Sequence, residues 1–162
     1  MLHVFFDTEF TDLGIGSKLI SIGLVTEDGD RQFYAELTGT YELAECCDFV
    51  RETVLPQLEG GSSVRMDMPT LTHHLGVWLL GLGESVQLVT DSLAWDWPWV
   101  QGIFWENGSW PRNVLSQPLI LGQTEEMNEA IETAFAQGLR QHHALDDAKA
   151  NRLAWLSIQR EN

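Results

Sequence analysis

The chain has 162 residues, a hydrophobic fraction of 44% and a formal net charge of −15, which is typical of one acidic globular domain. This charge argues against a protein that coats long duplex DNA or RNA, because such binding depends on Lys and Arg residues that neutralise phosphates. It does not exclude a short nucleic acid that is held through metal ions.

Membrane and export signals are not expected in this sequence. No apolar run approaches the roughly 18 residues of a membrane span. The start lacks a basic region and a small-residue cleavage site, so we expect no signal peptide and no membrane partner. Cys46 and Cys47 are adjacent, and neighbours in sequence rarely form an unstrained disulfide. We therefore expect reduced thiols in a cytoplasmic protein.

The first part of the chain is rich in strand signals. Residues 2–7 form an apolar run, and residues 18–26 (KLISIGLVT) form a second. The acidic, Gly-containing turn at residues 27–30 separates this second run from a third predicted strand at residues 32–37. The second and third strands are thus predicted to form a hairpin.

Helical spacing begins in the middle of the chain. Apolar residues predict a helix over residues 46–58, followed by a loop at residues 60–68. Pro69, a residue favoured at helix starts, precedes a predicted helix that ends near residue 82. Residues 86–89 (VQLV) are the fourth predicted strand.

The last part of the chain is mainly helical. A short helix is predicted to end near residue 104, and a short strand is predicted at residues 119–121. Thr124 can cap a helix that is closed by Gly138, and the last helix covers residues 145–159. Strands, helices and returning strands in this order predict an α/β fold, a mixed sheet with helices on its faces.

Two carboxylates stand at the end of the first predicted strand, with Asp7 as its last residue and Glu9 two positions later. In an extended chain, residues i and i+2 project from the same face, roughly 6.6 Å apart. They can converge on one divalent cation or on two neighbouring ones, and hard oxygen ligands suit Mg²⁺ or Mn²⁺. Taken alone, the pair is better explained as a strand that ends in a solvated turn.

Further carboxylates stand where other elements begin. Asp91 and Asp96 flank the turn after the fourth strand, and His142 precedes Asp147 by five positions at the start of the last helix. An imidazole near its natural pKa is suited to accept a proton from a metal-bound water. An acidic first turn also has a simpler explanation, because Asp146 and Asp147 interact favourably with the helix dipole.

Taken in order, three motifs between residues 7 and 148 resemble the DEDDh 3′–5′ exonuclease superfamily, which includes ribonuclease T, oligoribonuclease and proofreading subunits of DNA polymerases. The motifs are D-T-E-F-T, D-S-L-A-W-D and H-H-A-L-D-D-A. The spacing is most similar to the small exoribonuclease-like branch. In the second motif the resemblance selects Asp96, after Trp95, and leaves Asp91 outside the ligand set. Ser92 departs from the Asn that the family often has near this point.

The resemblance implies a single exonuclease domain over residues 1–162 with a ribonuclease-H-like fold, a five-stranded mixed sheet whose second strand is antiparallel. It implies two Mg²⁺ or Mn²⁺ ions and a histidine general base, which would be His142, with His143 as the competitor. The reaction would hydrolyse the 3′-terminal phosphodiester of short single-stranded RNA, in preference to DNA, and release nucleoside 5′-monophosphates. The implied partners are nucleic-acid 3′ ends and a second copy in a homodimer. The metal ligands would be Asp7, Glu9, Asp96 and Asp147.

On the substrate side, the family's nucleotide-lining positions fall on Phe10, Thr11 and Leu13. Phe10 is equally compatible with ordinary core packing. Trp97 or Trp99 could face the cleft, although large aromatic residues are more often core or interface residues.

Two other functions are compatible with the same residues. The fold could serve as a catalytically weak module that binds oligonucleotides or proteins, although a binding role does not need a general base. An unrelated two-metal phosphoryl hydrolase is a further alternative. Removal of Asp7 or His142 separates the first from the exonuclease, because binding would then survive while hydrolysis collapses.

Overall fold

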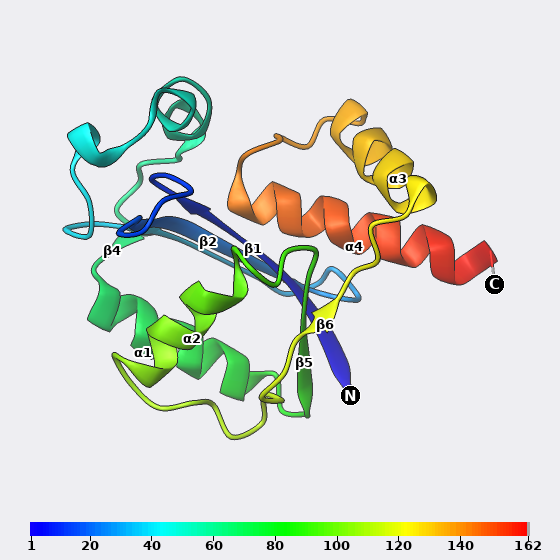
Figure 1. The fold of residues 1–162 in the computed structure, drawn as a ribbon. Coiled ribbons are helices and arrows are strands. Elements are labelled where there is room, and N and C mark those ends of the chain that lie inside the picture. The colour runs from blue at the N-terminus through cyan, green and yellow to red at the C-terminus, as the bar shows by residue number, and fades with distance from the viewer. Residues whose placement is uncertain (162) are drawn as a thin grey trace.

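The computed structural model describes residues 1 to 161, and its centre is a six-stranded mixed sheet in the order β4-β3-β2-β1-β5-β6 (Figure 1). β2 is antiparallel to β1 and β3, while β5 pairs in parallel with β1 and β6. The predicted mixed sheet with an antiparallel second strand is therefore confirmed. The strands are β1 (Leu2–Phe10), β2 (Leu19–Thr26), β3 (Gln32–Leu37), β4 (Arg65–Met66), β5 (Val86–Thr90) and β6 (Leu119–Ile120).

One strand, β4, is additional to the five that were predicted. It pairs in parallel with the end of β3 within a segment that the sequence predicted as a loop. Two residues are too few for hydrophobic alternation to be visible in a sequence, so this edge strand could not be predicted from the sequence pattern.

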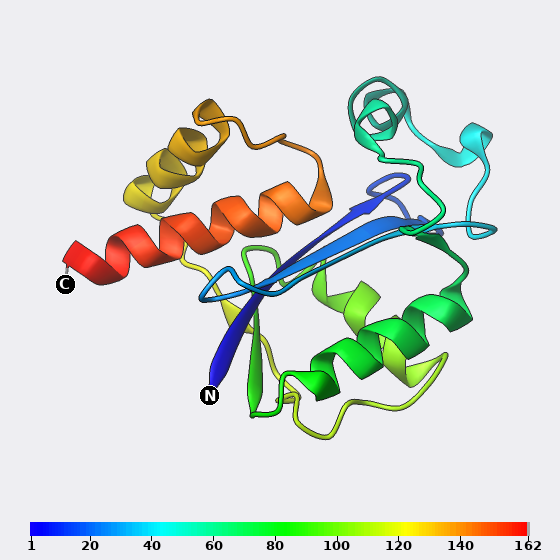
Figure 2. The same cartoon turned by 180° about the vertical axis from the view of Figure 1, so that it is seen from behind.

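Helices cover both faces of the sheet (Figures 1 and 2). α1 (Met68–Gly81) and α2 (Trp97–Trp105) pack on one face, and α3 (Glu125–Ala136) and α4 (Ala144–Glu161) lie over the other. Thr124 caps α3 as predicted, because its side chain accepts a hydrogen bond from the backbone N–H of Met127. Within the described residues, no helix has the length and apolarity needed to cross a membrane.

The segment predicted as one helix over residues 46–58 is broken into shorter pieces. A 3₁₀ turn at Leu43–Glu45 precedes a π-helical turn at Val50–Val54 and a second 3₁₀ turn at Leu55–Gln57. Pro56 has no N–H and prevents a continuous α-helix at this point. The segment packs its apolar residues, including the free thiol of Cys46, against Ile20 of β2.

Alternation along β1 decides which face of the sheet carries each side chain. Val4 and Phe6 are buried in the core with α1 and α2, whereas Phe5 is buried in the core with α4. By the same alternation, Asp7 and Glu9 lie on the α4 face. Both predicted carboxylates are thereby aimed at the helix that carries the third motif.

Gly23 of β2 allows α4 to approach the sheet at this point. It is the register partner of Asp7, and a methyl group added to it would overlap the backbone of Ala144 and Leu145. A residue with a side chain would therefore hold the first turn of α4 away from Asp7.

Candidate active site

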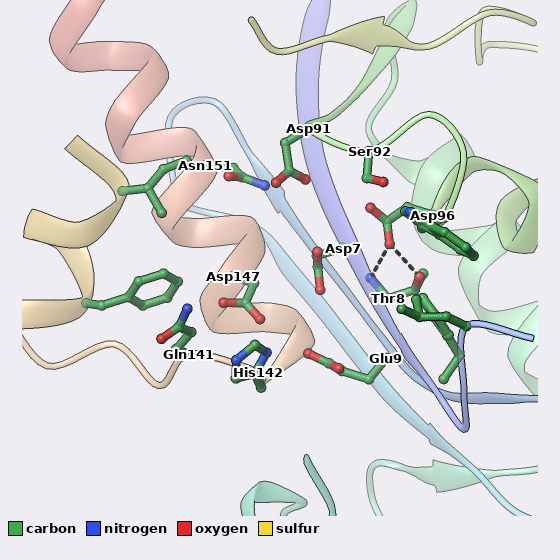
Figure 3. Close-up of a pocket in the computed structure, with 15 residues that line it drawn as sticks. Asp7, Thr8, Glu9, Asp91, Ser92, Asp96, Gln141, His142, Asp147 and Asn151 are labelled. Carbon is green, nitrogen blue, oxygen red and sulfur yellow. Dashed lines mark hydrogen bonds between the residues drawn. The ribbon is translucent and has the colours of Figure 1, made fainter. Parts of the chain in front are cut away.

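A pocket of about 330 Å³ opens where the carboxyl ends of β1 and β5 meet the start of α4. Its walls carry carboxylates, aromatic rings and one imidazole. Figure 3 shows the side chains of Asp7, Glu9 and Asp147 and the ring of His142 directed toward the same space. The fold therefore brings the first and third sequence motifs together.

The acidic groups form two clusters, each with ligand atoms within 4.8 Å of one another. The first cluster contains Glu9, His142 and Asp147, and the second contains Asp7, Asp91 and Asp96. A change of register between Glu9 and Phe10 marks a bulge at the end of β1. Bulges of this kind re-aim side chains and are common beside active sites.

Asp96 is held rigidly at the N-terminus of α2. Its Oδ1 accepts hydrogen bonds from the hydroxyl of Thr8 at 2.6 Å and from the backbone N–H of Thr8 at 3.2 Å. Its Oδ2 accepts from the hydroxyl of Thr90 at 3.0 Å (Figure 3 shows the Thr8 contacts). The side chain of Thr8 lies on the opposite face from Asp7, so β1 orients one acidic residue directly and another through a hydrogen bond.

His142 and Asp147 come from the loop and the first turn of α4. His142 has a φ angle of +65°, a left-handed conformation that is uncommon for a non-Gly residue and that often occurs at functional sites. The ring of Phe49 contacts the His142 ring edge-on, with 4.9 Å between centroids. Burial lowers the pKa of His142, so its imidazole is neutral and able to accept a proton at pH 7.

Burial and mutual repulsion raise the pKa values of all four predicted metal ligands. Burial is the main cause for each, and it raises the pKa of Glu9 to about 9, that of Asp147 to about 7 and that of Asp96 to about 6. The pKa of Asp7 lies well above its ordinary value, through burial and then the charges of Asp96 and Asp147. Glu9 and Asp147 also share a hydrogen bond.

These carboxylates fit divalent cations. Oxygen-rich sites without thiolates suit Mg²⁺ and Mn²⁺, and a divalent charge offsets the repulsion that raises the pKa values. Oδ1 of Asp91 is shielded from solvent and has no hydrogen-bond partner among the described residues, which leaves a polar atom that a cation would satisfy.

His143, the competing base, lies elsewhere. The residue is 2% exposed, and its ring stacks on Tyr34 with 4.5 Å between centroids. Its Nε2 lies 3.6 Å from the carboxylate of Glu59, and the residue does not line the pocket. The structure therefore places His142, and not His143, beside the carboxylates of the pocket.

The predicted substrate residues divide into two groups. Phe10 and Leu13 line the pocket. Thr11 does not, because it is 1% exposed and its hydroxyl accepts a hydrogen bond from the backbone N–H of Lys18. Its backbone N–H donates to Lys18 O, and its carbonyl accepts from Cys47 N–H, so both backbone groups are occupied.

Among the tryptophans, Trp95 is the one that lines the pocket. It is 47% exposed and stacks on Phe10, with 6.3 Å between centroids and 21° between planes. Trp97 is 5% exposed and packs in the core, which agrees with the core interpretation. The ring of Trp99 also contacts that of Phe10, with 5.9 Å between centroids.

Five polar residues of the pocket were not among the predicted site residues, namely Thr8, Asp91, Ser92, Gln141 and Asn151. Asn151 follows Asp147 by four positions, a spacing that puts both on one helix face and could have revealed it. Gln141 and Asp91 lie in irregular segments, where spacing does not determine direction.

Comparisons with known proteins were made by sequence and by fold. No family model matches the chain. Over 57 residues it is 44% identical to 3′-5′ exoribonuclease Rv2179c of Mycobacterium tuberculosis strain H37Rv, and equally to 3′-5′ exoribonuclease MT2234.1 of strain CDC 1551. This match covers 35% of the chain and spans only a third of the relatives' length (33%).

The fold as a whole is similar to that of Pop2p from S. pombe in its Mg²⁺- and Mn²⁺-bound form. The TM-score is 0.61 and the identity 14%, over 97% of this chain and 82% of that chain. Together with the strand order, this similarity confirms the predicted ribonuclease-H-like α/β fold.

Proposed function

We propose that the chain is a metal-dependent 3′–5′ exonuclease of the DEDDh type. The observation that carries the proposal is the convergence of the acidic clusters and His142 in one pocket at the strand ends of this fold. The partial similarity to proteins named 3′-5′ exoribonucleases supports the reaction class and favours RNA over DNA.

The residues that would hold two Mg²⁺ or Mn²⁺ ions are Asp7, Glu9, Asp96 and Asp147. When bound, the ions would lower the pKa of the attacking water and stabilise the negative charge on the leaving oxygen. Asp7 belongs to the second cluster, and the charges of Asp96 and of Asp147, a member of the first cluster, both act on it. Its carboxylate would therefore help to hold both ions.

His142 would act as the general base. Its ring nitrogen lies within 4.8 Å of carboxylate oxygens of Glu9 and Asp147, so it is close to the groups that would hold the metal ions. The nitrogen accepts the water proton while the water oxygen bonds to phosphorus. The bond from phosphorus to the 3′ oxygen of the preceding nucleotide would break, and this oxygen would take up a proton from solvent, which releases a nucleoside 5′-monophosphate and leaves a 3′-hydroxyl on the shortened strand.

The apolar side of the pocket would hold the terminal base. Phe10 and Leu13 line this side, and the exposed ring of Trp95 adds a flat surface next to Phe10. Every base has a π-face, so stacking here is tolerant of sequence. A base that enters such a pocket must be unpaired, which favours single-stranded 3′ ends.

The first experiment is a gel assay with 5′-labelled single-stranded RNA and DNA oligomers. Each oligomer is incubated with Mg²⁺, Mn²⁺ or EDTA, and Asp7→Asn is run beside the wild type. We expect a metal-dependent ladder that shortens from the 3′ end, faster on RNA, and no ladder from the variant.

His142→Ala tests the base, and His143→Ala is its matched control. We expect the first to lose most activity at pH 7 and the second to retain it. If neither metal supports shortening but the oligomers still bind, the chain is a binding module and the proposed chemistry is wrong.

The homodimer and the cytoplasmic location stay predictions. Light scattering after size exclusion measures the first, and a mass of about twice 18.3 kDa would support it. Fractionation of cells that express the chain would test the second.

A further inference from the structure

Asp91 occupies a position that the four-carboxylate pattern does not assign. It follows β5 directly, and β5 pairs in parallel with β1, the strand that carries Asp7. Its carboxylate lies within 4.8 Å of a carboxylate oxygen of Asp7 and of Asp96. In Figure 3 it stands at the same opening as Asp7, on the side away from Glu9.

The carboxylate of Asp91 has no structural role that the hydrogen bonds explain. Its Oδ1 is shielded from solvent and has no partner among the described residues. In the same turn, the backbone N–H of Ser92 bonds to the hydroxyl of Thr90 at 3.0 Å, not to Asp91. A shielded carboxylate oxygen without a donor is unfavourable unless a cation satisfies it.

The neighbouring carboxylate, Asp96, has hydrogen-bond donors for both of its oxygens. Its oxygens already accept hydrogen bonds from Thr8 and Thr90, so the fold satisfies it without any ion. Asp91 therefore has more to gain than Asp96 from direct contact with a cation placed between them and Asp7.

We propose that Asp91 is a fifth metal-ligating carboxylate, which contacts directly the divalent cation on the Asp96 side of Asp7. This inference rests on the proposed function only in requiring that the pocket binds divalent metal. Three carboxylates would then hold this cation without help from a substrate phosphate. The chain would accordingly bind both of its cations before any nucleic acid arrives.

The test is calorimetric titration of Mn²⁺ into the whole protein without nucleic acid. We expect two bound ions in the wild type and a loss of affinity for one of them in Asp91→Asn, by at least about tenfold, since even outer-shell partners change metal affinity by 10–100-fold. Glu126→Gln removes the same charge from an exposed residue outside this pocket and should leave both affinities within about twofold. Equal affinities in Asp91→Asn and the wild type would overturn the proposal.

A second variant distinguishes direct metal ligation by residue 91 from an electrostatic effect of its charge at a distance. Asp91→Cys places a thiolate at the same position, and Cd²⁺ bound to it should give a thiolate-to-metal charge-transfer band in excess of any that Cys46 and Cys47 give in the wild type. Absence of the band, with Cd²⁺ bound elsewhere in the pocket, would show that Asp91 acts at a distance and would also overturn the proposal.

Two further outcomes keep the inference distinct from the proposed function. In EDTA, Asp91→Asn should melt no lower than the wild type, because it removes a charge that repels its neighbours; a lower melting temperature would assign Asp91 to the fold instead. If the wild type binds no Mn²⁺ at all, both proposals fail. If it binds two ions and Asp91→Asn does so equally well, only the role of Asp91 fails.

Discussion

Removal of metal ions makes the stability of this protein depend on pH in an unusual direction. Ordinary carboxylates are more acidic in the folded state, but burial raises the pKa of Glu9 from 4.5 to about 9. The folded chain thus holds a proton that the unfolded chain releases at pH values above about 4.3. Stability from this group is complete below the unfolded pKa and is lost as the pH rises toward 9, so the metal-free protein becomes less stable in alkali.

The magnitude follows from the number of extra protons. Each proton that the folded chain holds in excess of the unfolded chain lowers the free energy of unfolding by about 1.4 kcal/mol for every unit that the pH rises. The lowered pKa of His142 acts in the opposite sense, but only below about pH 7, because the unfolded side chain titrates near 6.5. Between pH 7 and 8.5, Glu9 alone therefore costs about 2 kcal/mol, which corresponds to a fall in Tm of roughly 4–8 °C for a domain of this size.

Thermal melts in EDTA and in Mg²⁺ at pH 7 and pH 8.5 measure this effect. We expect the Tm in EDTA to fall over this interval, and the gain from Mg²⁺ to be larger at pH 8.5, where fewer protons compete with the metal. Asp7→Asn removes the charge of Asp7 from the pocket. It should reduce both the fall of the Tm with pH in EDTA and the gain in Tm from Mg²⁺. A Tm in EDTA that stays constant or rises with pH would refute the electrostatic account of the pocket.

Three further substitutions test the support of the site. Thr8→Val removes the 2.6 Å hydroxyl contact with buried Asp96 and should cost about 1–3 kcal/mol in urea unfolding; an unchanged midpoint would contradict this. Trp95→Ala should raise the KM for oligonucleotides by about tenfold with little change in kcat, because stacking is worth about 1–3 kcal/mol per base; a fall in kcat alone would assign Trp95 to the catalytic step. Gly23→Ala should destabilise the chain by about 1–3 kcal/mol and weaken Mn²⁺ binding, because the added methyl overlaps the backbone of Leu145; normal binding would show that α4 can shift without cost.

The sequence was sufficient for the parts of the site that depend on local geometry. Asp7 and Glu9 share a face because a strand repeats every two residues, and His142 precedes Asp147 by five positions, from the loop into the first turn of α4. Neither relation depends on the rest of the fold, so both could be predicted. The same is true of the Thr124 cap, where a side chain bonds to the backbone three positions later.

Features that depend on contacts between residues far apart in the sequence could not be predicted in the same way. The turn after β5 contains Asp91 and Asp96, and the hydrogen bonds from Thr8, 88 positions away, show that Asp96 is anchored by the fold. Likewise, the exposure of Trp95 and the burial of Trp97 depend on how α2 packs on the sheet. The helix predicted over residues 46–58 was wrong in its continuity, because Pro56 and a π-helical turn divide it.

The distribution of charge sets an order of events for any nucleic-acid substrate. The chain has 24 acidic and 9 basic residues, and two of the basic residues closest to the third motif are already paired. Arg140 donates to the carboxylate of Asp146 at 2.7 Å, and the ammonium of Lys149 lies 3.5 Å from the same side chain. A phosphate that approaches the empty pocket therefore meets carboxylates and few free cations. Two divalent ions would offset most of the charge of the pocket carboxylates, so we expect metal to bind first and only the phosphates next to the ions to be attracted. Affinity should then depend on the last few nucleotides and not on strand length, which is what a short single-stranded 3′ end requires.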